Sequence, residues 1–72
     1  MSENEAREKR VEWLRSLDKQ ALAAVAAACC TTAEYIRQIS HFYGGRRPSV
    51  AMAKLLAEHT GLPRAAWRPD VW

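Results

Sequence analysis

Long apolar runs are absent from this chain of 72 residues. The longest, from Ala21 to Cys30, covers roughly half of what a membrane-crossing helix needs. The segment from Ser2 to Ala6 is mostly polar and lacks the apolar core of a secretory signal. We therefore expect a protein that does not enter a membrane, that stays in the cytoplasm, and whose cysteines are reduced.

Strand patterns are missing as well. No stretch alternates polar and apolar residues for long enough to predict a β-strand, so the sequence indicates the all-α class. It also contains no Ser/His/Asp set, no carboxylate pair of the kind found in a catalytic cleft and no glycine-rich loop for phosphates. We expect no enzyme activity, no catalytic residue and no cofactor.

The chain has only two cysteines, and they are adjacent. Zinc sites usually separate paired cysteines by about two to four residues and need four ligands. Cys29 and Cys30 do not fit that spacing, so we expect no metal site. Cys29 has the position of a core residue, and a redox switch remains an alternative.

Helix signals occur along the whole chain and predict one compact domain over residues 1–72. Asp18, Thr32 and Ser49 are N-caps, while Gly44 and Gly61 lie where helices stop. The predicted helices cover about 5–17, 19–29, 33–43 and 50–60, with a short turn at 63–67. In the first of them, acidic residues precede basic ones by four positions, as in Glu3 and Arg7, which favours ion pairs along the helix.

The predicted helix 33–43 has two contrasting faces. At about 100° per residue, one arc is apolar and is expected to join the core; it contains Tyr35, Ile36, Ile39, Phe42 and Tyr43. The opposite arc is polar and contains Ala33, Glu34, Arg37, Gln38 and His41. Side chains of this kind can read base edges in a DNA major groove.

Positive charge is concentrated in the same part of the chain. The net charge is +3, yet residues 1–32 hold five basic and five acidic groups. Residues 33–72 hold six basic and three acidic groups and therefore carry the whole excess. Two of the basic groups, Arg46 and Arg47, follow Gly44-Gly45 directly, where they are well placed to contact phosphate oxygens.

Several separated motifs resemble those of a known family. Thr31-Thr32-Ala33-Glu34-Tyr35-Ile36-Arg37-Gln38-Ile39, Gly44-Gly45-Arg46-Arg47-Pro48-Ser49 and Arg68-Pro69-Asp70-Val71-Trp72 stand in the same order as in Cro-type, lambda-repressor-like helix-turn-helix proteins. The chain is most similar to the small YdaS antitoxin-like regulators of phages and prophages. The resemblance covers residues 19–72 and implies a compact helix-turn-helix domain of four to five helices.

The resemblance also implies roles for individual residues. The base-reading positions are those of Ala33, Glu34, Arg37 and Gln38, although Arg37 has phosphate contact as a rival role. Contacts with the DNA backbone are expected from Thr32, His41, Arg46, Arg47 and Ser49. The turn position that the family usually gives to glycine is Cys30, which would strain the backbone at positive φ.

These observations predict a transcriptional regulator of the Cro-like phage or prophage type in a bacterial host cell. It would bind a double-stranded DNA operator as a homodimer, with one recognition helix from each subunit in the major groove. Trp67 is a candidate core residue and, with Trp72, a candidate dimer contact, while Trp72 could instead fold back over its own domain. The alternative function is a protein-interaction module, such as an antitoxin that binds a toxin or a host factor.

Overall fold

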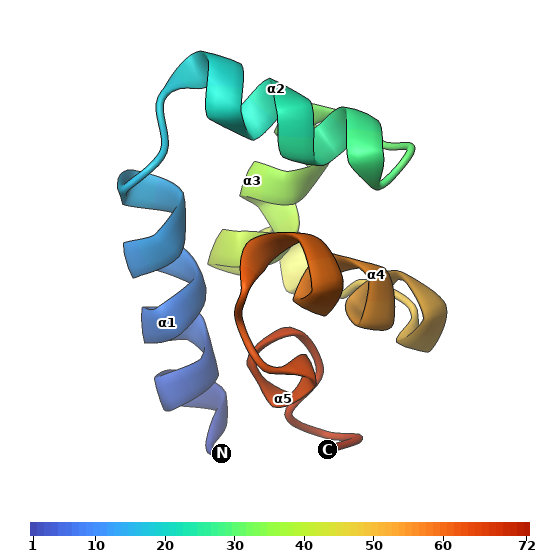
Figure 1. Cartoon of the computed structure of the whole chain (residues 1–72). Helices are drawn as coiled ribbons and strands as arrows, with labels where there is room; N and C mark the ends of the chain where they lie inside the picture. Colours follow the sequence, from blue (N-terminus) through green and yellow to red (C-terminus); the bar gives the residue numbers. More distant parts are fainter.

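The computed structural model describes all 72 residues and contains helices only (Figure 1). The α-helices are α1 (Glu3–Arg15), α2 (Lys19–Ala28), α3 (Ala33–His41), α4 (Val50–Thr60) and α5 (Arg64–Trp67), and a 3-10 turn η1 covers Tyr43–Gly45. The all-α class with five helices is thus confirmed. None of these helices is long and apolar enough to span a membrane.

Side-chain caps explain where the helices begin. The backbone N–H of Ala21 donates to the Asp18 carboxylate at 2.7 Å, which confirms the predicted cap of α2. Thr32 and Ser49 cap α3 and α4 in the same way, each accepting at 3.1 Å. Each cap occupies one of the backbone donors that a helix start leaves free, so these boundaries follow from the local sequence.

The first helix lies two residues closer to the N-terminus than predicted, at 3–15 in place of 5–17. Ser2 caps its start by accepting from the backbone N–H of Glu5. At the other end the Ser16 hydroxyl donates to the Trp13 carbonyl at 2.6 Å. Ser2 and Ser16 thus set the two ends of α1, which the sequence prediction placed two residues too far along the chain.

The third helix ends two residues earlier than predicted because Phe42 adopts a left-handed conformation with φ of 60°. The chain then turns through η1, and Tyr43 points to solvent with 58% of its surface exposed. The prediction that Tyr43 joins the core was wrong. It assumed that the helical period continues past His41, whereas the period stops at Phe42.

The core consists of two clusters. Leu22, Ala26 and Ile36 form one between α2 and α3. The other joins α3, α4 and α5 around Trp67, whose ring meets that of Trp13 edge to face at 5.6 Å. Since Trp67 is only 2% exposed, its predicted role as a dimer contact was wrong: the ring is needed inside the monomer.

A buried arginine links three helices. Arg10 of α1 is 3% exposed, and its guanidinium donates to the carbonyls of Ser40 at 3.2 Å and Ala66 at 2.7 Å. Both carbonyls lie in the last turn of a helix, where such groups lack partners within the helix. Burial lowers the pKa of Arg10 because desolvation disfavours the charged form.

Both ends of the chain lie at the same end of the molecule, as the N and C labels of Figure 1 show. Arg47 forms ion pairs with Glu3 at 2.7 Å and Asp70 at 3.0 Å, and Arg68 pairs with Asp70 at 2.6 Å. We call this set, together with Arg10, the terminal seam. Glu3 therefore pairs across the fold, and the predicted ion pair with Arg7 along the helix does not form.

Candidate nucleic-acid interface

The connection between α2 and α3 is a tight helical C-cap. Thr31 N–H donates to the Ala26 carbonyl at 2.9 Å, and Cys30 N–H donates to the Ala27 carbonyl at 3.1 Å. The first hydrogen bond spans five positions of the chain and the second spans three. This pair of bonds is the Schellman motif, which places the residue after the helix cap in the left-handed region. Cys30 has φ of 55°, so this turn position does take the left-handed conformation whose strain was considered for it.

The tight turn lets α2 cross α3 closely, as Figure 1 shows at the top of the molecule. Ala26, 4% exposed, packs with the fully buried Ile36 at this crossing. The small side chain of Ala26 allows the two helices to approach. With Ile36 turned inward, the polar arc of α3 is held on the outside.

Four predicted site residues meet at one hollow of about 460 Å³. Glu34, Arg37 and Gln38 line it from α3, and Arg46 lines it from the loop, together with Tyr43 and Gly44. We call this surface the α3 face. The three ion pairs of the structure all lie in the terminal seam, so Glu34, Arg37 and Arg46 form none. Their charges are free to meet a ligand.

Two neighbouring arginines face different parts of the molecule. Arg46 lines the α3 face, whereas Arg47 lies over the Phe42 ring at 4.8 Å and pairs with Glu3 and Asp70. Arg47 is already held by two carboxylates, one of which it shares with Arg68, so the structure favours Arg46 over Arg47 as a phosphate contact. Phosphate contacts were expected from both arginines, and the surroundings of Arg47 do not favour such a contact.

The remaining predicted contacts do not line this hollow. Ala33 is half-buried against the α2–α3 cluster and does not line the hollow. Thr32 and Ser49 are exposed, and each uses its hydroxyl oxygen as a cap. His41 stacks on Tyr43, with ring centroids 5.0 Å apart and an angle of 10° between the planes.

The cysteines differ in environment. Cys29 is buried in the core, and burial raises the pKa of its thiol, whereas Cys30 is exposed in the turn. Both are free thiols. No group of three or more His, Cys, Asp or Glu side chains is arranged to hold a metal ion.

The sequence interpretation missed two features of this surface. Tyr43 was placed in the core, although the glycines that follow it are typical of a helix that stops early. Arg7 and Arg15 of α1 were not considered as site residues, although both line a hollow together with His41. Comparisons with protein-family models, with curated proteins and with solved structures found no match for this chain.

Proposed function

We propose that this chain is a sequence-specific DNA-binding transcriptional regulator of the Cro-like type. The observation that carries the proposal is the α3 face, a polar helix surface whose charged groups have no partner within the protein. It lies on the second helix of a tightly turned pair, the arrangement in which helix-turn-helix proteins present the helix that enters the major groove. The groove is about 12 Å wide and admits one α-helix.

Within this proposal the residues of the α3 face divide by reach and charge. Gln38 can donate to and accept from an adenine edge, and Glu34 can accept from the amino group of cytosine. Arg46 lies in the loop at the border of the face, where it would bind a backbone phosphate. Arg37 can act either way. The net charge of +3 favours a polyanionic ligand over a neutral one.

The proposed regulator is a homodimer in the cytoplasm of a bacterial host and is directed to an operator with two half-sites. Two recognition helices that read successive major grooves must lie about 34 Å apart, which a single domain of 30 × 23 × 22 Å with one such helix cannot provide. Trp72 is 38% exposed at the chain end and lies near the Arg64 guanidinium at 5.7 Å. Trp72 remains our candidate dimer contact. The proposed regulator needs no catalytic step, because its presence on a promoter is sufficient for repression.

A second candidate function is favoured by one observation. Val71 is 46% exposed beside Trp72, so the tail presents two apolar side chains next to each other. Such a tail could bind another protein, as an antitoxin binds a toxin. This candidate predicts a protein complex that forms without DNA.

Binding-site selection from a random duplex pool tests the proposal. The parent should return one consensus, and Glu34→Ala and Gln38→Ala should each relax it at about one base pair, which corresponds to about 1–3 kcal/mol on the cognate site only. Glu58→Ala on α4 is the matched control, because it removes an exposed carboxylate outside the α3 face. A parent that shows no binding to any duplex would refute the proposal.

A further inference from the structure

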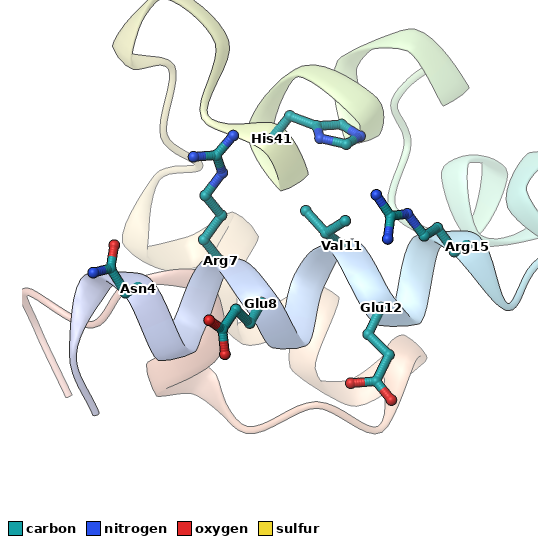
Figure 2. A pocket seen from close by; sticks show the side chains of 7 residues that line it. All are labelled: Asn4, Arg7, Glu8, Val11, Glu12, Arg15 and His41. Atoms are coloured by element: carbon teal, nitrogen blue, oxygen red, sulfur yellow. The ribbon is translucent and has the colours of Figure 1, made fainter.

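A second and larger hollow, of about 630 Å³, lies between α1 and the end of α3. Figure 2 shows that Arg7 and Arg15 project from α1 toward the side where His41 lies, whereas Glu8 and Glu12 project the other way. Val11 lies between the two arginines and is the one hydrophobic residue of the lining. We call this surface the α1 face.

The arginines of the α1 face have no partner within the protein. All three ion pairs lie in the terminal seam, and neither Arg7 nor Arg15 takes part in them. Glu3, which the sequence predicted as a partner of Arg7, is bound to Arg47. Two positive charges, eight positions apart, therefore remain open to solvent without an ion pair. Glu8 and Glu12 also line the hollow, but their side chains project to the other side of α1.

The α1 face adjoins the α3 face through a pair of stacked rings. His41 lines the hollow of the α1 face, and Tyr43 lines that of the α3 face. Since the two rings stack at 5.0 Å, the hollows lie on either side of one aromatic pair. A ligand that lies along α3 and extends past His41 would next meet Arg7 and Arg15.

We infer that Arg7 and Arg15 contact backbone phosphates of the same DNA duplex whose major groove holds α3, an inference that rests on the proposed function. The arginines are eight positions apart, which corresponds to about 12 Å along a helix, so they can reach two separate phosphates. A mostly polar, open lining suits a sugar-phosphate backbone better than a small apolar ligand. The first helix thus enlarges the DNA-binding surface without reading sequence.

The test is the salt dependence of binding to a cognate and a random duplex. Arg7→Gln/Arg15→Gln should lower the slope of log affinity against log salt by about two for each bound subunit and weaken both duplexes about tenfold or more. The control Lys9→Gln/Lys54→Gln removes the same charge from exposed sites outside both hollows and should keep the parent slope. Thermal unfolding of each variant checks that the fold is retained.

Hydroxyl-radical footprinting gives an independent readout. In the arginine variant, protection should disappear at one flank of each half-site and persist at the centre of each half-site. A slope and footprint equal to those of the control would overturn this inference while the proposed function stands. A parent that binds no duplex would instead refute the proposed function, and this inference with it.

Discussion

The terminal seam and the α3 face use arginine in opposite ways. In the seam, the guanidiniums of Arg10, Arg47 and Arg68 are bound by carbonyls or carboxylates of the protein. On the α3 face, Arg37 and Arg46 have no ion pair. One set holds the two chain ends to the rest of the fold, and the other set offers charge to the outside. The difference shows that the net charge of +3 is not uniformly available for binding.

Arg46 and Arg47 show why sequence alone could not separate the two uses. They are adjacent, they follow the same glycines, and both were predicted to contact phosphates. What distinguishes them is Glu3 and Asp70, which approach Arg47 from opposite ends of the chain. Such partners depend on how the termini fold together, and no local pattern records that.

Loss of Arg10 should have the largest effect on stability. Arg10→Ala leaves two helix-end carbonyls buried without their donor, and each such group costs about 1–3 kcal/mol. We expect the free energy of unfolding to fall by about 2–6 kcal/mol in urea titrations. Arg7→Ala, an exposed arginine of the same helix, should change it by about 0.5 kcal/mol or less. Equal losses in both variants would contradict the assignment of Arg10 to the seam.

Single replacement of the two loop arginines sharpens the comparison. For each bound subunit, Arg46→Ala should weaken cognate and random duplexes alike by about 1 kcal/mol and lower the salt slope by about one. Arg47→Ala should change the slope less and should lower the free energy of unfolding by about 0–1 kcal/mol, the usual range for exposed ion pairs. Mobility shifts at several salt concentrations measure the first effect, and urea titrations the second. A larger slope change in Arg47→Ala would reverse the assignment.

The sequence predicted the parts of the fold that depend on local signals. The caps Asp18, Thr32 and Ser49 and the inward side of α3 follow from hydrogen bonds or periods within a few residues. Tyr43 was misplaced, because an early stop at Phe42 turned it outward. Trp67 lies in the core, as expected, beside the distant Trp13 ring, and only its alternative role as a dimer contact does not fit its burial.

The same division applies to the candidate site. The residues of the α3 face could be predicted because they share one helical arc, and their hollow confirms that Glu34, Arg37 and Gln38 lie together. The contribution of α1 could not be predicted, because only tertiary packing brings its arginines to the same hollow as His41. Site residues that lie on one helix could be predicted from the sequence, whereas site residues that tertiary packing brings together from different helices could not.

Acid should weaken the seam through Asp70. The hydrogen bond from Arg68 holds the pKa of this carboxyl well below its usual range, so its contribution to stability is present above about pH 4, the usual value for an unfolded chain. It is lost progressively as the pH falls further. Asp70→Asn should therefore be less stable than the parent at pH 7, with a gap that narrows below about pH 4.

Urea midpoints measured at several pH values test this expectation. Glu58→Gln is the matched control, because it removes one exposed carboxylate that forms no ion pair. A gap between parent and Asp70→Asn that widens on acidification would show that the ion pair with Arg68 does not stabilise the fold. DNA binding at neutral pH should change little, since Asp70 lies outside the α3 face.

The smallest effect is expected at the turn that holds the α3 face in place. Cys30 adopts φ of 55°, a conformation that glycine enters without the clash of a Cβ atom. Cys30→Gly should therefore stabilise the fold by up to about 1 kcal/mol, a rise of a few degrees in the unfolding midpoint. Gly61→Ala makes the reverse change at φ of 76°, where an added Cβ meets no neighbouring atom, and it should destabilise by a similar amount.

The two variants separate the effect of backbone strain from the effect of charge, because neither substitution changes a charge. The salt slope of DNA binding should stay at the parent value in both variants, since Arg37 and Arg46 are unchanged. A lower midpoint for Cys30→Gly would mean that the Cys30 side chain contributes more to stability than relief of its φ angle would gain. The turn between α2 and α3 would then depend on this cysteine, and glycine could not replace it.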